Sequence, residues 1–326
     1  MVEHEAIQKV INRIKSDLIG GAADTAKEIV DALVKAVEDS KASEATALVQ
    51  EIEMAIDAIL AVMPSFAPPI NALHLIMRAV EDTLDKGLSV HEIKSVVLDA
   101  ASSFHVKASD ALTKVAHIGA EMIQNNDVIF TYSMSSTVWK IIATAKRQGK
   151  NISVIVTESR PKNEGLWTVS EMAKYGIPIT VGIDAAIGTL IPGSNMVIVG
   201  ADAIASNGSA LCKVGTYPTA LVAREHGVPF YIAADTWKFD TSSLLGFPFK
   251  IEHVTRSDIL DDDAPTNATV RSPLFDITPA YLISAVITER GVIPPTACFA
   301  IMQTMPLSRT ISAKIERWAR GRIKFG

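Results

Sequence analysis

The chain has 326 residues, a hydrophobic content of 48% and a formal net charge of −5. This length allows about two domains with a large apolar core, and the acidic balance gives no overall attraction to nucleic acid. The two cysteines, Cys212 and Cys298, lie far apart and argue against a disulfide framework. No stretch approaches the roughly 18 uncharged apolar residues of a membrane span, so we expect a cytoplasmic protein without membrane contact.

Residues 1–124 are predicted to form a helical N-terminal domain. Apolar residues recur there at intervals of three and four, as in Ile29, Leu33 and Val37, which is the period of a helix with one buried face. Glycine, proline and polar residues break the pattern at 19–21, 39–41, 64–69 and 86–87. We expect about six helices, the last near residues 105–124.

Residues 125–308 are predicted to form a Rossmann-like, doubly wound α/β domain with a mostly parallel sheet. Short Val/Ile-rich runs alternate there with segments of helical period, and such runs are typical of parallel strands buried on both faces. The expected strands lie at 128–131, 152–156, 179–183, 196–199, 230–233 and 285–287. In such sheets ligands bind beyond the carboxyl ends of the strands.

Polar residues follow these strand ends. Asp202 comes after the run at 196–199, and one predicted loop carries it together with Asn207 and Lys213. Lys213 and Lys238 could both project into the crevice, where two ammonium groups and nearby backbone amides would favour phosphate. The alternative is a capping Asp202, a turn at Asn207-Gly208 and two surface lysines.

Two further sites have both a structural and a functional interpretation. The loop after the second strand holds Arg160 and Glu164, which could face a ligand or form an internal ion pair that fixes the loop. Gly20, Gly21 and Ala22 start a helix, so their free N–H groups could bind an anion or simply mark a helix break.

Residues 309–326 are predicted to form a basic C-terminal helix or tail. Its cations include Arg309, Lys314 and Arg317. We interpret it as a solvated amphipathic helix with Ile315, Trp318 and Ile323 against the body, and contact with RNA or a protein partner as the alternative.

The chain lacks the GxGxxG, P-loop, HExxH and GxSxG motifs, and its seven histidines form no ligand cluster, so no metal site or cofactor is expected. Several ordered segments instead resemble one superfamily, which contains the α, β and δ regulatory subunits of translation initiation factor 2B, ribose-1,5-bisphosphate isomerase and methylthioribose-1-phosphate isomerase. These segments are Val156–Gly165, Gly200–Asp202, Asn207-Gly208, Lys213–Thr216, Lys238-Phe239, Phe275–Pro279 and Ile287–Pro295.

The chain departs from the isomerases of this superfamily at several positions. Their Thr-His-Cys-Asn motif, whose thiol works with the loop aspartate, aligns with Thr131-Tyr132-Ser133-Met134, and Cys212 stands where they have Asn before the lysine. A serine hydroxyl is far less acidic than a thiol of pKa near 8.5. Gly20 and Phe66 stand where two phosphate-binding arginines are expected, which would weaken substrate binding.

The resemblance therefore favours a regulatory or binding protein related to initiation factor 2B, without isomerase competence. Its ligand would be a phosphorylated sugar or nucleotide, bound by Gly20, Gly21, Ala22, Ser133, Arg160, Glu164, Asp202, Asn207, Lys213 and Lys238. The expected assembly is a homodimer or higher homo-oligomer, and a translation initiation factor is a further candidate partner. The alternative is an aldose–ketose isomerase of a phosphorylated pentose, with Asp202 and Ser133 as its catalytic pair.

Overall fold

The computed structural model describes residues 1–16, 20–84, 86–87 and 89–320, without the side chains of 318–320. The chain divides into two compact units, each assembled from separate segments. The helical unit comprises Met1–Ser109, Trp237–Pro248 and Ile301–Gly326, and the sheet unit comprises Asp110–Thr236 and Phe249–Ala300. The boundaries expected from the sequence, after residues 124 and 308, do not coincide with these units.

The N-terminal region forms five helices over the described residues: α1 (Glu5–Lys15), α2 (Ala22–Asp39), α3 (Ala45–Val62), α4 (Ala67–Leu84) and α5 (Val90–Met122). The first four begin and end near the predicted breaks. The expectation of a sixth helix starting near residue 105 is wrong, because α5 is continuous over 33 residues. Neither glycine nor proline occurs between Val90 and Ile118, so nothing in the sequence interrupts this helix.

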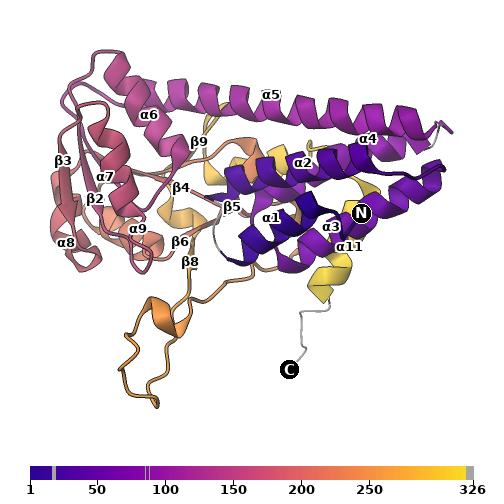
Figure 1. The fold of residues 1–326 in the computed structure, drawn as a ribbon. Helices are drawn as coiled ribbons and strands as arrows, with labels where there is room; N and C mark the ends of the chain where they lie inside the picture. Colours follow the sequence, from indigo (N-terminus) through magenta and orange to yellow (C-terminus); the bar gives the residue numbers. More distant parts are fainter. Residues whose placement is uncertain (17–19, 85, 88, 321–326) are drawn as a thin grey trace. The chain divides into compact units, whose positions relative to one another are not determined.

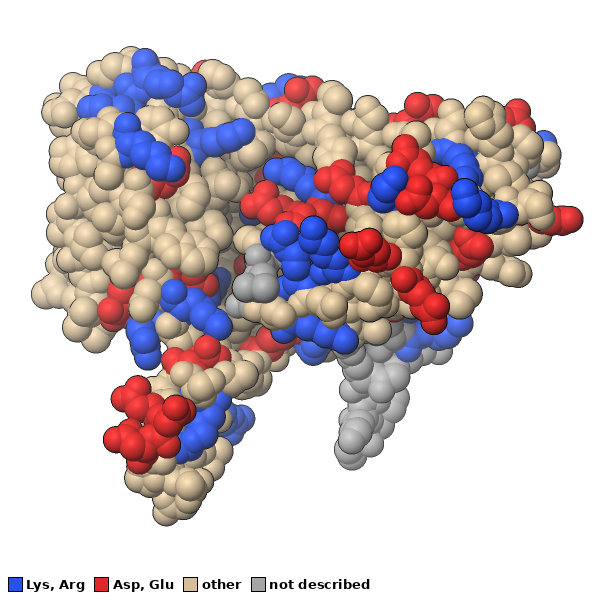
Figure 2. Space-filling model, viewed as in Figure 1, with Lys and Arg blue, Asp and Glu red and all other residues tan. Residues whose placement is uncertain are grey.

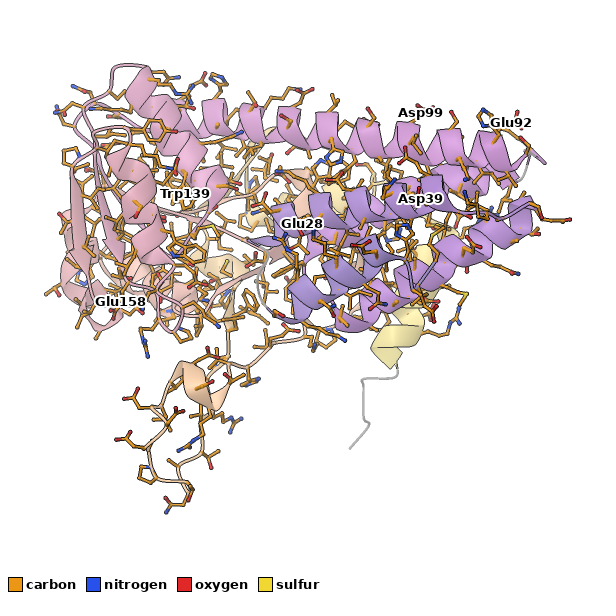
Figure 3. All side chains as sticks on the ribbon, in the orientation of Figure 1. Glu28, Asp39, Glu92, Asp99, Trp139 and Glu158 are labelled. Carbon is orange, nitrogen blue, oxygen red and sulfur yellow. The ribbon has the colours of Figure 1, made fainter. Side chains whose placement is uncertain are left out.

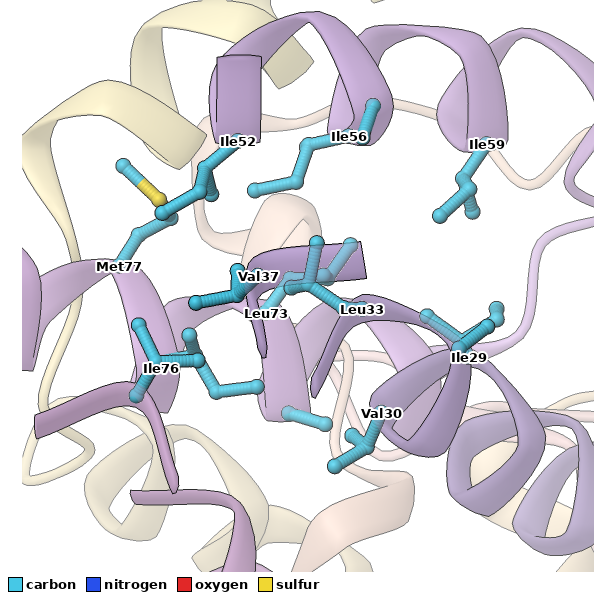
Figure 4. Packing of buried hydrophobic residues seen from close by; sticks show 14 of the residues in the cluster. Ile29, Val30, Leu33, Val37, Ile52, Ile56, Ile59, Leu73, Ile76 and Met77 are labelled. Carbon is cyan, nitrogen blue, oxygen red and sulfur yellow. The ribbon is translucent and has the colours of Figure 1, made fainter. Parts of the chain in front are cut away.

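The apolar stripes of these helices form the core of the helical unit (Figure 4). Ile29 and Leu33 on α2 are fully buried, as are Ile52 on α3 and Leu73 on α4. These residues recur at helical spacing, and β-branched and leucine side chains fill the space between the helices. The predicted amphipathic pattern therefore corresponds to a real buried face.

The C-terminal helix α11 (Arg309–Arg320) belongs to the same unit and adds Ile311 and Ile315 to its core. The Glu81 carboxylate on α4 accepts hydrogen bonds from the Ser308 hydroxyl (2.7 Å) and the Thr310 N–H (2.8 Å) at the start of this helix. Lys314, at 9% exposure, pairs with Asp57 at 2.7 Å, so it is not the solvated residue we expected. Ile315 packs as predicted. Ile323 and the Trp318 side chain lie outside the described part.

A short segment, residues 237–248, also belongs to the helical unit. The Asn71 side-chain amide on α4 donates to the carbonyls of Trp237 (2.6 Å) and Phe239 (2.9 Å). The Trp237 ring packs edge-on against Phe104 of α5. These contacts hold the main chain on both sides of Lys238, whose side chain is buried.

The sheet unit is built on a seven-stranded sheet in the order β10-β9-β7-β4-β1-β2-β3. Its strands are β1 (Val128–Thr131), β2 (Ser153–Thr157), β3 (Ile179–Gly182), β4 (Met196–Gly200), β7 (Phe230–Ala233), β9 (Ala285–Thr288) and β10 (Gly291–Ile293). All neighbours pair in parallel except the edge strand β10. All six predicted strands are confirmed, and β10 is an addition that the sequence analysis missed.

Both faces of the central strands are buried. Ile129 and Phe130 point to opposite faces of β1 and both are fully buried, as are Val197 and Ile198 on β4. Four helices accompany this sheet (Figure 1): α6 (Ser136–Arg147), α7 (Gly165–Ala173), α8 (Ile187–Leu190) and α9 (Thr216–Glu225). A short α10 (Cys298–Met302) follows β10. The predicted doubly wound, mostly parallel fold is therefore confirmed.

A second, three-stranded antiparallel sheet lies in the same unit: β5 (Ala203–Ile204), β6 (Ala210–Lys213) and β8 (Phe275–Thr278). Residues 249–274 extend away from it as a long excursion before β8, and acidic side chains gather on it (Figures 1 and 2). Asp261, Asp262 and Asp263 are exposed there. Among the described residues no helix is both long and apolar enough to cross a lipid bilayer.

Candidate functional site

The strand order reverses direction between β1 and β4. From β1 the chain continues to β2 and β3 on one side, and then crosses to β4, β7 and β9 on the other. In doubly wound sheets the crevice at such a switch point receives the ligand. Ser133 lies two residues beyond β1 and Asp202 lies two residues beyond β4, so the two proposed catalytic residues follow the two strands that flank the switch point.

The loops after these two strands touch each other. A Cβ added to Gly200, the last residue of β4, would lie 2.4 Å from the Ser135 hydroxyl. Glycine is therefore required at this position unless Ser135 moves. The contact brings the Ser133–Ser135 turn against the start of the Gly200–Asp202 segment.

Ser133 has an unusual backbone conformation that two side chains hold. Its φ of 60° is in the left-handed region, which non-glycine residues rarely adopt. The Ser133 N–H donates to the Ser159 hydroxyl (2.8 Å), and the Ser133 carbonyl accepts from the Thr168 hydroxyl (2.7 Å). Thr168 in turn accepts from the indole N–H of Trp139 on α6, labelled in Figure 3 (2.8 Å).

Three of the four non-glycine left-handed residues in the described part of the chain lie at these strand ends, and the fourth, Asn126, precedes β1. Ser159 (φ 61°) and Asn163 (φ 57°) on the loop after β2 share this conformation with Ser133. Backbone strain of this kind concentrates at functional sites, where the surroundings hold the unfavourable conformation. The cluster therefore independently points to the ends of β1 and β2.

Tyr132 connects this region to the loop before α9. Its side chain is 4% exposed, and a Cβ added to Gly215 would lie 2.1 Å from its hydroxyl oxygen. Gly215 also has a φ of 102°, so glycine is needed for two reasons. Burial raises the pKa of Tyr132, and the nearby charge of Asp184 adds to this effect, so the phenol stays protonated.

Asp276 on β8 fixes the start of α9. Its carboxylate accepts hydrogen bonds from the N–H groups of Gly215 (2.7 Å) and Tyr217 (3.1 Å). Burial raises the pKa of Asp276 to about 6, although these backbone hydrogen bonds oppose the shift. The turn that follows Lys213 is thus held by a carboxylate on the neighbouring strand.

Lys213 is a strand residue with a partner. It ends β6, so the expectation that Asp202, Asn207 and Lys213 share one loop is wrong: β5 and β6 form a hairpin between them. The strands are short and poor in β-branched residues, which hid them in the sequence. The Lys213 ammonium lies 2.5 Å from a Glu164 carboxylate oxygen, with the two side chains only 8% and 17% exposed.

The loop after β2 uses this ion pair in place of an Arg160–Glu164 contact. Arg160 is exposed, and its backbone N–H donates to Asp184 (2.7 Å). The second oxygen of Glu164 is buried and has no hydrogen-bond partner among the residues that the structure describes. Lys213 carries a charge that Glu164 already compensates.

The remaining predicted residues are less central. Asn207 is exposed and its side chain accepts from the Ser209 N–H (2.9 Å), which is the turn geometry of the structural alternative. Gly21 caps α2 without a side-chain hydrogen bond, and Ala22 begins that helix. Gly20, Gly21, Ala22 and Lys238 belong to the helical unit, and their participation in a ligand site remains a prediction.

Sequence reasoning missed the supporting residues. Ser159, Thr168, Asp184 and Asp276 each hold a loop at the strand ends, yet none was selected as a site residue. Ser159 and Asp276 lie inside the segments that carry the family resemblance, and Ser159 and Asp184 come just after two predicted strands, which were the available signals. Thr168 lies on α7 and is distinguished only by its contacts.

These features define a doubly wound α/β protein whose candidate site lies at the sheet's switch point. The model of the initiation factor 2 subunit family matches residues 18–295, and the chain belongs to that family. The chain is 34% identical to ribose 1,5-bisphosphate isomerase of Thermococcus kodakarensis over 301 residues, 91% of this chain and 94% of that protein.

Two solved structures show the same fold. Translation initiation factor eIF-2B from Pyrococcus horikoshii OT3 is 32% identical with a TM-score of 0.74, over 90% of this chain and 98% of that one. The 5-methylthioribose 1-phosphate isomerase from the same organism is 25% identical with a TM-score of 0.73, over 95% and 88%. The family thus includes proteins named as isomerases and proteins named as initiation factors.

Proposed function

We propose that this chain is an aldose–ketose isomerase of a phosphorylated pentose, of the ribose-1,5-bisphosphate type. The observation that carries the proposal is the placement of Ser133 and Asp202 after the two strands that flank the switch point. Several relatives named ribose 1,5-bisphosphate isomerase, at 31–34% identity over more than 90% of the chain, support it. This reverses the order expected from the sequence, which favoured a non-catalytic protein.

Isomerisation requires hydrogen to move between adjacent sugar carbons. Asp202 is the proposed group that shuttles the proton or polarises the substrate hydroxyl, and Ser133, or a water molecule beside it, acts in place of a thiol. A serine hydroxyl is a poor general acid, and a well-placed general acid or base contributes about 10²–10⁴-fold to the rate. We therefore expect slow turnover from the natural chain.

The second candidate is a protein that binds a phosphorylated sugar and senses it without converting it. Ser133 favours this alternative, because the hydroxyl provides neither the acidity nor the nucleophilicity of a thiol. Both candidates share the ligand class and the strand-end site, and they differ only in whether product forms.

Turnover assays separate the two. Purified protein is incubated with ribose-1,5-bisphosphate, methylthioribose-1-phosphate or other pentose phosphates, and ketose is detected by NMR. The isomerase predicts measurable product, its loss in Asp202→Asn and an increase of about 10²-fold or more in Ser133→Cys. A thermal shift with ligand but no product from either the natural chain or Ser133→Cys would establish the sensing protein instead.

A further inference from the structure

The main chain at position 133 is bonded to side chains on both sides. The Ser133 N–H donates to Ser159 and its carbonyl accepts from Thr168, while neither bond involves the Ser133 hydroxyl. Backbone groups usually pair with other backbone groups, so two side-chain partners at one residue are unusual. The side chains of Ser159 and Thr168, rather than that of Ser133 itself, therefore hold the backbone conformation at this position.

The direction of each hydrogen bond from Trp139 through Thr168 to Ser133 is fixed. The Trp139 indole nitrogen can only donate, so it occupies an acceptor position of the Thr168 hydroxyl. The single proton of that hydroxyl then goes to the Ser133 carbonyl (2.7 Å). Thr168 is 1% exposed and Ser159 is fully buried, so water does not compete for either contact.

The contacts also account for the unfavourable backbone angle. A left-handed conformation is unfavourable at a non-glycine residue and persists only where the surroundings hold it. At Ser133 (φ 60°) the surroundings are the loop after β2, through Ser159, and helix α7, through Thr168. The loop contacts the Ser133 N–H and the helix contacts the Ser133 carbonyl, so the peptide units on both sides of this residue are held.

We propose that Ser159 and Thr168 are positioning residues that hold position 133 in one conformation whatever small side chain it carries. The inference rests on the proposed function, since it treats position 133 as part of the reacting site. It predicts that a thiol introduced there takes the place of the hydroxyl without a change in backbone. It also predicts that removal of either contact frees the side chain at 133.

A thiol reporter tests this without any need for turnover. In Ser133→Cys, alkylation by iodoacetamide is followed residue by residue by peptide mass spectrometry, with the buried Cys212 and Cys298 as internal references. Adding Thr168→Val or Ser159→Ala is expected to speed alkylation of the introduced thiol at least fivefold. Thr168→Ser, which keeps the hydroxyl, and Ser170→Ala, elsewhere on α7, are expected to leave the rate within twofold.

Rates within twofold of Ser133→Cys in both contact variants would overturn the proposal. Equal acceleration at the introduced thiol, Cys212 and Cys298 would also overturn it, because that result indicates general loosening of the unit. If no variant turns over a sugar phosphate, the proposed function fails, and the alkylation rates still decide the positioning role. Where turnover is present, Thr168→Val is expected to lower kcat of Ser133→Cys with little change in KM.

Discussion

At the scale of single residues, the site is determined by which charges already have partners. Lys213 was expected to provide a free cation for phosphate, but Glu164, 49 positions earlier, neutralises it at 2.5 Å in a nearly buried pair. A sequence cannot reveal such a partner, because the two residues meet only when the loop after β2 reaches β6. Ser133 and Asp202, by contrast, follow predicted strands, and the strand order alone brings them to one switch point.

Removal of one member of this pair should be costly. Lys213→Met leaves the Glu164 carboxylate buried and uncompensated, so the free energy of unfolding is expected to fall by about 3–5 kcal/mol. Replacing both residues, in Lys213→Met with Glu164→Met, is expected to cost less than either single change. Urea denaturation followed by circular dichroism measures these differences.

The chain provides a matched control at its surface. Lys174 and Glu171 also lie 2.5 Å apart, but the lysine is 66% exposed. Lys174→Met is expected to leave the urea midpoint unchanged. Equal effects of Lys213→Met and Lys174→Met would contradict the importance of burial.

The raised pKa of Asp276 predicts a pH dependence of stability. Its pKa is about 6 in the folded protein against 3.8 for an ordinary aspartate, so the folded state binds the proton more tightly. The contribution of this group to stability is therefore present at pH 4 and is lost as pH rises to about 6. One pKa unit corresponds to about 1.4 kcal/mol, so the loss is on the order of 3 kcal/mol at most.

Comparison with Asp276→Asn isolates this group. The stability of the natural chain minus that of the variant, measured by urea denaturation at pH 4, 5, 6 and 7, is expected to decrease over this range. Burial lowers the pKa of His74 to about 4, so this group makes the folded state more stable as pH rises. The effect is the same in the natural chain and in Asp276→Asn, so it cancels in the difference. A constant difference across the range would show that Asp276 has an ordinary pKa.

At the scale of helices and strands, the sequence predicted best the strands that are buried on both faces. Runs such as Val154–Val156 are apolar on both faces, so the parallel strands were found. The hairpin and sheet of β5, β6 and β8 were missed because β5 has two residues, and because the apolar and polar alternation of β8 covers only the four residues Phe275–Thr278. The pairing of β6 with β8 depends on contacts across about 65 residues of chain, which local patterns do not encode.

Helix α11 depends on a carboxylate supplied by another helix. Burial alone would raise the pKa of Glu81, but hydrogen bonds from Thr310, Ser308 and Arg309 outweigh it and leave the pKa below the ordinary value. Glu81→Ala leaves N–H groups at the start of α11 without partners, so the free energy of unfolding is expected to fall by about 1–3 kcal/mol. Trypsin should then cleave faster at Arg309, with the exposed Glu121→Ala as control.

At the scale of the whole molecule, assembly remains a prediction with a specific surface to test. On the sheet unit, Leu221 on α9 is 42% exposed, Ile277 on β8 is 40% exposed and Tyr281 just after β8 is 67% exposed. The Arg224 guanidinium lies over the Tyr281 ring, 5.4 Å from its centre. Aromatic residues and arginine are enriched at protein interfaces.

We expect the natural chain to form a homodimer or higher homo-oligomer through this surface, and Tyr281→Asp to lower the assembly state. Light scattering after size exclusion measures the mass directly. Tyr175→Asp, at an exposed tyrosine after α7, is the control and should leave the mass unchanged. A monomeric natural chain would disprove the prediction.

The core of the helical unit is complete only when α11 has been added. Glu81 sits on α4, which ends at Leu84, and the helix whose start it caps begins about 225 residues later, at Arg309. At a synthesis rate of about 5–20 residues per second, the early helices wait roughly 10–45 s on the ribosome for that piece. Until α11 has been made, the apolar surface that Ile311 and Ile315 cover in the folded helical unit stays exposed.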